Sequence, residues 1–195
     1  MNKQRSYAII LKIFPESVEF SMNIVKAQKN DLDSIERIYS RIHDREEKGL
    51  TTIGWIRSIY PTRKTAEDAL SRDDLFVMTD NGKIVAAAVI NQIQVSEYRD
   101  AAWKHAAQER EVMVLHCLAV DPLESGKGYG RAFVAFYEDY AKRHGCAALR
   151  MDTNVKNARA RKLYQLLGYE EVGIVKCVFN GIPDVQLVCL EKYLG

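Results

Sequence analysis

The chain lacks the features that would place it in a membrane, in a complex with nucleic acid or in an oxidising compartment. Its 195 residues contain no apolar run near the ~20 residues that a membrane-spanning helix needs. A formal net charge of only +2 argues against a nucleic-acid binder that relies on bulk electrostatics. The four cysteines show no C-x-x-C pairing and lie mostly in apolar runs, as reduced and buried thiols do. We therefore expect a cytoplasmic protein that does not act on a membrane and does not rely on bulk charge to bind nucleic acid.

The first residues match part of the pattern of a secretion signal. Lys3 and Arg5 precede a short apolar run, but Lys12 interrupts it and no small-residue cleavage site follows. Regular patterning begins only at Met22. A chain of this length is most simply one domain, so we expect residues 1–21 to be an N-terminal extension and 22–195 to be the domain.

The periodicity of apolar residues predicts alternating strands and helices without an internal repeat. The expected elements are a strand at 23–27, a helix from 30 or 31 to about 43, a weaker helical or loop segment at 44–60, a helix at 65–72 with a capping box, a hairpin of 75–79 and 84–90, a polar loop at 91–110, a buried strand at 112–120, a helix at 131–144, a strand at 147–153, a helix at 157–167, and a terminal hairpin of 169–179 and 185–190. A helical crossover should make strands 112–120 and 147–153 parallel.

A glycine-rich turn follows the buried strand. Gly126, Gly128 and Gly130 alternate just before an amphipathic helix, so the first N–H groups of that helix stand open to an anion. We interpret the turn as a cradle for a diphosphate.

Two familiar phosphate motifs are excluded by spacing. A Walker A loop would need glycine where the chain has Asp121, and serine or threonine where it has Gly128. A dinucleotide fingerprint would need glycine in place of Arg131 or, counted from Gly128, in place of Phe133. Neither nucleotide-binding fold is supported.

The turn instead resembles the acetyl-CoA-binding motif of the GNAT acyltransferase superfamily. The matching residues are Val120-x-Pro122 followed by Gly126-Lys127-Gly128-Tyr129-Gly130. Residues 157–169 resemble that family's second signature, N-x-x-A-x-x-L-Y-x-x-x-G-[FY], and the element order from Met22 onward also fits. The resemblance implies an α/β (α+β) fold with a mixed, mostly antiparallel sheet, helices on both faces and a central parallel strand pair.

The resemblance also implies the residues that hold acetyl-CoA. Its pyrophosphate would lie on the N–H groups of 126–131, and its pantetheine arm would pair with 118–120, which places the Leu118 N–H near the thioester carbonyl. Lys127 and Arg131 either add charge or are simply exposed. Ser125 stands where the family usually has glutamine or arginine. The cofactor-binding set is Leu118, Ala119, Val120, Ser125, Gly126, Lys127, Gly128, Tyr129, Gly130, Arg131, Asn157 and Tyr164, with no metal.

Two catalytic residues follow from the same resemblance. Tyr164 is either a core aromatic or the general acid that protonates the leaving thiolate. His116 is either a satisfied structural histidine or the base for the acceptor amine, as in the serotonin N-acetyltransferases that this strand resembles. His116 and Leu118 should share one strand face and Cys117 should point to the other, which disfavours an acyl-cysteine route. Asn157 is expected to cap its helix and to contact CoA.

The acceptor is not specified by the sequence. The segments 44–60 and 91–110 should build its side of the site, with Trp55, Tyr60, Tyr98 and Trp103 as walls and Glu97 or Glu111 to attract an amine, although each also has an ordinary core or surface explanation. We predict an N-acetyltransferase that moves acetyl from acetyl-CoA to a small-molecule or peptide primary amine by direct attack in a ternary complex. The alternatives are a non-catalytic module that senses acyl-CoA, or an acyltransferase for a protein N-terminus or an aminoacyl-tRNA. The terminal hairpin offers a surface for a homodimer.

Overall fold

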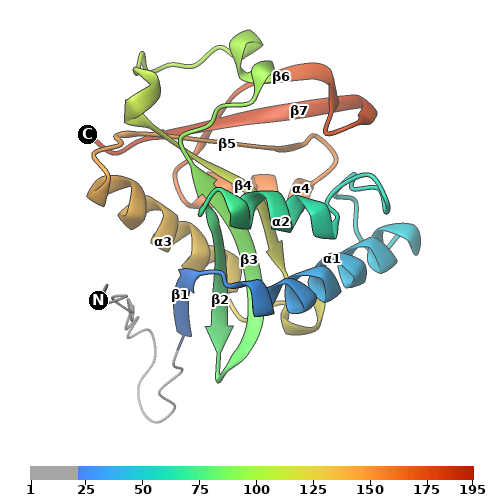
Figure 1. The fold of residues 1–195 in the computed structure, drawn as a ribbon. Helices are drawn as coiled ribbons and strands as arrows, with labels where there is room; N and C mark the ends of the chain where they lie inside the picture. Colours follow the sequence, from blue (N-terminus) through green and yellow to red (C-terminus); the bar gives the residue numbers. More distant parts are fainter. Residues whose placement is uncertain (1–21) are drawn as a thin grey trace.

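The computed structural model describes residues 22–195, which form a seven-stranded sheet with four α-helices (Figure 1). The strands are β1 (Met22–Lys26), β2 (Leu75–Asp80), β3 (Lys83–Asn91), β4 (Val112–Val120), β5 (Ala148–Asn154), β6 (Glu170–Phe179) and β7 (Ile182–Tyr193). The helices are α1 (Leu32–Glu47), α2 (Arg63–Ser71), α3 (Tyr129–Arg143) and α4 (Ala158–Leu166), with short 3-10 turns η1 (Lys29–Asp31), η2 (Ser96–Asp100), η3 (Glu109–Glu111) and η4 (Pro122–Glu124). The extension expected at residues 1–21 lies outside the described residues.

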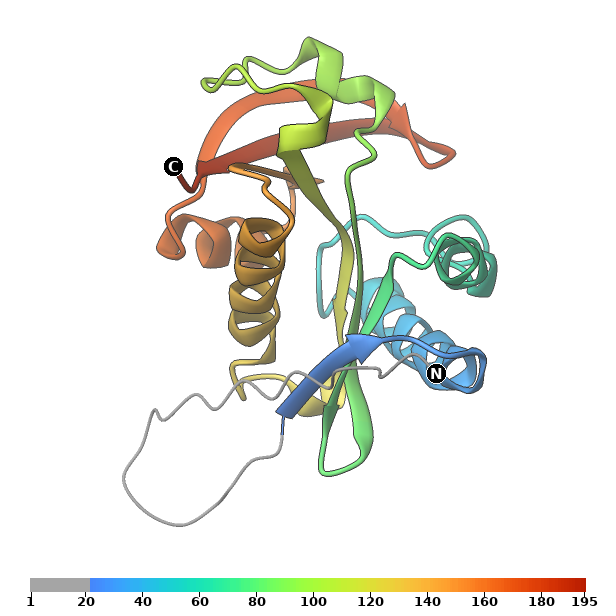
Figure 2. The same ribbon diagram turned by 60° about the vertical axis from the view of Figure 1, so that its left-hand side comes forward.

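The sheet order confirms the predicted fold class. The strands lie in the order β1-β2-β3-β4-β5-β7-β6, and β4 and β5 are the one parallel pair among the described strands. Helices α1 and α2 cover one face and α3 and α4 the other, so the sheet is the middle layer (Figure 2). None of the helices within residues 22–195 is long and apolar enough to span a bilayer.

The predicted start of helix α2 is wrong, and strand β7 begins at Ile182 rather than at residue 185. Helix α2 begins at Arg63 rather than at Thr65, because Thr62 precedes the helix in an extended conformation and its N–H donates to the Thr65 hydroxyl at 3.0 Å. Thr65 therefore serves as the third residue of the first turn and not as the cap.

The parallel pair separates along its length. Residues 112–115 of β4 pair with 148–151 of β5, and beyond this point neither strand pairs with the other. The two strands diverge in Figure 1, with β5 turning toward β7 while β4 continues beside β3. The divergence leaves room between the strands in the middle of the sheet.

A bulge interrupts β4 where the two strands part. The register between β3 and β4 shifts between Ala87 and Val89, so that Cys117 and Leu118 lie opposite the single residue Ala88. Cys117 has φ +51°, a left-handed conformation that non-glycine residues rarely adopt. Such an inserted residue bends a strand and re-aims the side chains that follow it.

The bulge corrects the predicted strand faces. Leu115 before it and Leu118 after it both belong to the core beneath α3, although three positions separate them. Cys117 packs in the core beneath α1 and α2. Since side chains alternate before the bulge, His116 also faces α1 and α2. The expectation that His116 shares a face with Leu118 and opposes Cys117 is therefore wrong.

Candidate active site

A cavity of about 450 Å³ opens where β4 leaves β5. It runs from the glycine-rich turn at the start of α3, past the end of β4, to the β6–β7 hairpin. Its lining residues are Ile42, Arg45, Thr51, Ile53, Gly54, Trp55, Tyr60, Cys117, Leu118, Val120, Pro122, Glu124, Ser125, Gly126, Gly128, Tyr129, Gly130, Arg131, Asp152, Thr153, Asn154, Asn157, Arg159, Ala160, Leu163, Tyr164, Phe179, Ile182, Val185 and Leu187. The predicted CoA-binding residues lie in this wall except Ala119, which is buried toward α1, and Lys127.

The glycine-rich turn presents the N-terminus of α3 to the cavity. Gly126 and Gly128 have φ of +88° and +82°, and Gly128 is the residue before the helix. Gly130 allows close packing, since a Cβ there would lie 3.3 Å from the Leu163 side chain of α4. The first N–H groups of α3 and its positive dipole end therefore face a space large enough for an anion.

Three arginines add positive charge to the cavity. Arg45, Arg131 and Arg159 line it, are exposed, and form no ion pair with any residue of 22–195. Lys127, in contrast, pairs with Glu124 at 2.6 Å, and that pair lowers the pKa of Glu124. Lys127 is thus engaged with a carboxylate, while the arginines are available for a ligand.

Tyr164 projects from α4 into the cavity wall. The residue is 7% exposed, and no group in residues 22–195 hydrogen-bonds its hydroxyl. Burial, and secondarily the nearby Asp152, raise the pKa of Tyr164 above its ordinary value. Asn157 caps the same helix as predicted, because its Oδ1 accepts the Ala160 N–H at 3.2 Å.

Asp152 is a cavity residue that the sequence reasoning missed. It follows the apolar run of β5, and its Oδ2 accepts the Tyr98 hydroxyl at 2.8 Å. Its other carboxylate oxygen has no partner within residues 22–195. Burial raises the pKa of the carboxyl to about 7, and the bond from Tyr98 only partly offsets this. A carboxylate inside a predicted strand whose other residues are mostly buried is the signal that could have identified it.

His116 lies outside the cavity wall. Its Nε2 is 3.2 Å from Asn91 Oδ1 and 3.1 Å from the Ile93 carbonyl. Burial lowers the pKa of its imidazole to about 4, so the ring is neutral at physiological pH. Two oxygen partners at Nε2 assign the proton to that nitrogen. The histidine is satisfied by the end of β3 rather than aimed at the cavity.

The predicted acceptor residues divide into two groups. Trp55 and Tyr60 line the cavity, with their rings 6.0 Å apart and edge to face. The other four do not line it: Tyr98 is buried behind Asp152, Trp103 packs on Tyr98, and Glu97 and Glu111 lie elsewhere in the segment between β3 and β4.

Cys117 does line the cavity, contrary to the expected strand geometry. Its sulfur lies 3.8 Å from the Tyr39 hydroxyl. Burial raises the pKa of the thiol to about 11, so it stays protonated at neutral pH and is a poor nucleophile. The environment of the thiol, and not its direction, is what disfavours an acyl-cysteine.

The segment between α1 and α2 is tied across the cavity. The Glu46 carboxylate accepts the N–H groups of Ile53 and Gly54 at 2.8 and 2.7 Å. The Thr52 hydroxyl donates to the Lys156 carbonyl beyond β5 at 3.0 Å. A Cβ on Gly54 would collide with the Asn154 side chain. Residues 51–54 thus join the last turn of α1 to the end of β5 along the cavity wall.

Comparisons with known proteins identify the family. The family model described as Acetyltransferase (GNAT) family matches residues 33–169. An uncharacterized N-acetyltransferase of Methanocaldococcus jannaschii is 29% identical over 154 residues, which cover 76% of this chain but only 60% of that protein. Ribosomal protein bS18-alanine N-acetyltransferase of Escherichia coli is 32% identical over 118 residues, covering 59% of this chain and 69% of the relative.

A solved structure shares the fold. The structure of yncA from Salmonella typhimurium with its cofactor acetyl-CoA superposes with a TM-score of 0.62 at 20% identity, covering 89% of this chain and 94% of the other. The family model spans most of the chain, including both sequence signatures and the helix that begins at the glycine-rich turn. The chain belongs to the GNAT acetyltransferase family.

Proposed function

We propose that the protein transfers the acetyl group of acetyl-CoA to a primary amine by direct attack in a ternary complex. The observation that carries the proposal is one continuous cavity with the N-terminus of α3 at one end and the pair Asp152 and Tyr164 in its wall. The three unpaired arginines suit the phosphates of CoA. The yncA structure is described with acetyl-CoA as its cofactor, which supports the same donor here.

The donor would lie along the glycine-rich turn and the free edge of β4. Its pyrophosphate would accept N–H groups from 126–131, and its pantetheine amides would pair with 118–120, since β5 has already left that edge. The Leu118 N–H would then donate to the thioester oxygen and stabilise the negative charge that develops there.

Asp152 and Tyr164 would carry the proton transfers of the reaction. The amine nitrogen forms a bond to the thioester carbon, and Asp152 accepts a proton from that nitrogen. The tetrahedral intermediate collapses, the carbon–sulfur bond breaks, and Tyr164 protonates the leaving sulfur. Proton return from Asp152 to Tyr164, directly or through water, restores both groups. The products are the amide and free CoA thiol.

Asp152 is favoured over His116 as the base for two reasons. Asp152 lines the cavity and His116 does not. The raised pKa of Asp152, about 7, matches the pH at which the base must work, whereas the His116 imidazole is a weak base with a pKa of about 4.

The acceptor end of the cavity suits an amine beside an apolar group. The residues there other than Asp152 include Trp55, Tyr60, Phe179, Ile182 and Leu187, from the α1–α2 segment and the β6–β7 hairpin. The relative from Escherichia coli acetylates an alanine of ribosomal protein bS18 by its name, so a peptide N-terminus is the second candidate acceptor. A short apolar N-terminal residue fits this lining better than a polyamine, which needs several carboxylates.

The test is a thiol-release screen with acetyl-CoA against monoamines, polyamines, amino acids, aminoglycosides and peptides with free N-termini. We expect turnover with an amine that carries an apolar neighbour, and mass spectrometry of the product should show a gain of one acetyl group. If the protein binds acetyl-CoA but no amine in any class releases thiol, it is a sensing module and the enzymatic proposal fails.

A further inference from the structure

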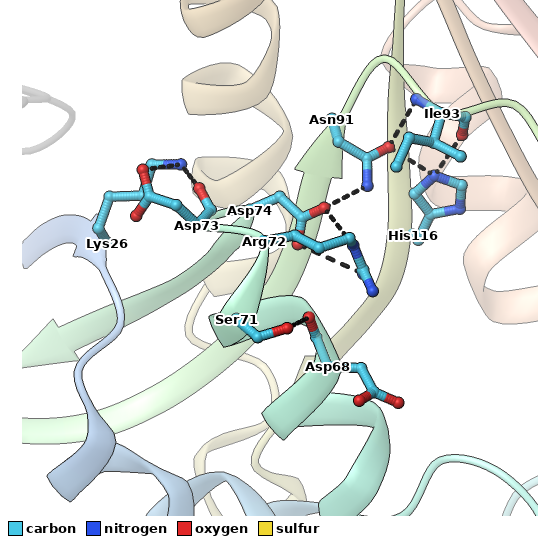
Figure 3. Close-up of polar contacts among 9 residues, drawn as sticks. All are labelled: Lys26, Asp68, Ser71, Arg72, Asp73, Asp74, Asn91, Ile93 and His116. Carbon is cyan, nitrogen blue, oxygen red and sulfur yellow. Dashed lines mark hydrogen bonds and ion pairs between the residues drawn. The ribbon is translucent and has the colours of Figure 1, made fainter.

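A chain of polar contacts runs from His116 through Asn91 at the end of β3 to Asp74, just before β2 (Figure 3). The imidazole Nε2–H is shared between Asn91 Oδ1 and the Ile93 carbonyl, at 3.2 and 3.1 Å. Asn91 in turn donates from Nδ2 to Asp74 at 2.7 Å and accepts the Ile93 N–H at 2.9 Å. The network therefore joins β4 to the end of β3 and to the residue that precedes β2.

The network ends in a carboxylate that is itself held from several sides. Asp74 is 6% exposed, and its carboxylate accepts the Arg72 guanidinium, with Nε at 3.0 Å. Its carbonyl accepts the Ile90 N–H at 2.9 Å. A fixed acceptor orients the Asn91 amide, so its Oδ1 is left pointing at His116. The position of the imidazole is thus set by β2 and β3, not by the cavity.

His116 stands at a critical position in β4. The last pairing with β5 is Leu115 with Met151, immediately before it, and the left-handed Cys117 comes immediately after it. A non-glycine residue in this conformation costs about 1–2 kcal/mol and persists only where neighbouring contacts hold it. The His116 side chain ties the residue directly before Cys117 to Asn91 and Ile93 at the end of β3.

We propose that His116 is a positioning residue that holds the β4 bulge and so aims the Leu118 N–H into the cavity. The inference rests on the proposed function for its catalytic consequence, since Leu118 acts only if a thioester lies beside it. It assigns His116 no contact with substrate. The imidazole acts by donating one hydrogen bond, and a neutral side chain with an N–H at the same place can replace it.

The experiment compares three variants. His116→Ala removes the donor, and His116→Gln keeps an N–H close to the position of Nε2. His144→Ala is the matched control, because His144 is exposed at the end of α3 and stacks on Tyr140. For each variant we would measure kcat and KM for acetyl-CoA across pH, and the amide resonances of Cys117 and Leu118 by 15N NMR.

We expect His116→Ala to lower kcat about tenfold, because a small displacement of an oxyanion donor is costly, with little change in KM. The Cys117 and Leu118 amide resonances should move, and the shape of the pH–rate profile should not. His116→Gln should restore both kcat and the resonances, and His144→Ala should change neither. Should His116→Ala fail to fold, Asn91→Ala removes one of the two acceptors and should give the same signature more weakly.

Two results would overturn the inference. A rate in His116→Ala that recovers at high pH, with no rescue by glutamine, would make His116 a base. Unmoved Cys117 and Leu118 resonances would show that the bulge does not depend on it. If the wild type releases no thiol with any amine, the proposed function fails, but the resonances still test the bulge by themselves.

Discussion

Asp152 on β5 and Tyr164 on α4 line the same cavity, and the two side chains are electrostatically coupled. Burial raises the pKa of Tyr164 most, and the carboxylate of Asp152 raises it further. When Asp152 takes a proton from the acceptor amine, its negative charge disappears. Tyr164 then loses that opposing charge and becomes a stronger acid as the thiolate begins to leave. One proton transfer therefore prepares the next.

The coupling makes Asp152→Asn the most direct test of the mechanism. Without a base, kcat/KM should fall about 100-fold or more. In the wild type, kcat/KM should rise with pH through about 7, because only the ionised carboxylate accepts a proton. This rise of kcat/KM with pH should disappear in the variant when both proteins are assayed by thiol release with the same amine. Asp100→Asn, at the exposed last residue of the 3-10 turn η2, is the matched control. If kcat/KM of Asp152→Asn still rose with pH through the same range, Asp152 would not be the base.

The same substitution should lower activity but raise the stability of the folded protein. Burial raises the folded pKa of Asp152 to about 7, whereas an unfolded aspartate titrates near ~3.9. Between these values the folded state binds more protons than the unfolded state, so this residue lowers the free energy of unfolding as pH rises. Asparagine has no such dependence and can still accept from Tyr98. Urea unfolding should therefore show Asp152→Asn gaining on the wild type from pH 4 to 7 and keeping a constant advantage above it. An advantage that shrinks over that range would contradict the assigned pKa.

Much of the fold could be read from the sequence because its elements are locally consistent. The apolar stripe of α1 and the turn at Asn81-Gly82 specify their elements without help from distant residues. The glycine-rich turn also marks one end of the cavity, since a site made of backbone N–H groups needs only glycines and the start of a helix. These features depend on neighbours in the chain.

What could not be read depends on contacts between distant segments. The bulge at Cys117 has no signature in the sequence of an apolar strand, yet it places His116 and Leu118 on opposite faces of the sheet. Asp152 becomes a candidate base because folding buries its carboxyl in the cavity wall, where its hydrogen-bond donor is Tyr98, 54 residues away in sequence. Arg45 joins the cavity because α1 ends beside it, and no local pattern distinguishes it from other surface arginines.

Tyr164→Phe separates the enzyme from a binding module. The variant should bind acetyl-CoA within about threefold of the wild type while kcat falls about 100-fold, since only the proton for the leaving sulfur is lost. Tyr169→Phe is the matched control, because the Tyr169 hydroxyl is buried, has no partner within residues 22–195 and lies outside the cavity wall. Calorimetric titration with acetyl-CoA and thiol release together give both quantities. Equal rates in the two variants would exclude Tyr164 as the acid.

Glu46→Ala should raise the KM for the acceptor amine and leave the affinity for acetyl-CoA unchanged. Loss of the carboxylate frees two N–H groups in the segment that bridges the cavity, so the acceptor KM should rise about fivefold through disorder of that segment. Glu47→Ala is the control, because Glu47 pairs with Arg57 on the exposed side. Steady-state kinetics with each substrate varied would distinguish the two. A weaker affinity for acetyl-CoA with an unchanged acceptor KM would show that residues 51–54 serve the donor instead.

Alanine substitutions at two glycines, one at each end of α3, distinguish an effect on ligand binding from an effect of backbone strain. Gly128 and Gly145 have φ of +82° and +72°, and a Cβ at either would meet no atom within 4 Å. Alanine at each position should therefore cost about 1 kcal/mol of stability, because a left-handed alanine is strained in both. Only the Cβ at position 128 would project into the space where the proposed pyrophosphate approaches the helix N-terminus. Gly128→Ala should weaken acetyl-CoA binding about tenfold or more, and Gly145→Ala should leave it unchanged. Equal affinities in the two variants, measured by calorimetry at matched stability, would mean that the phosphates do not lie on this turn.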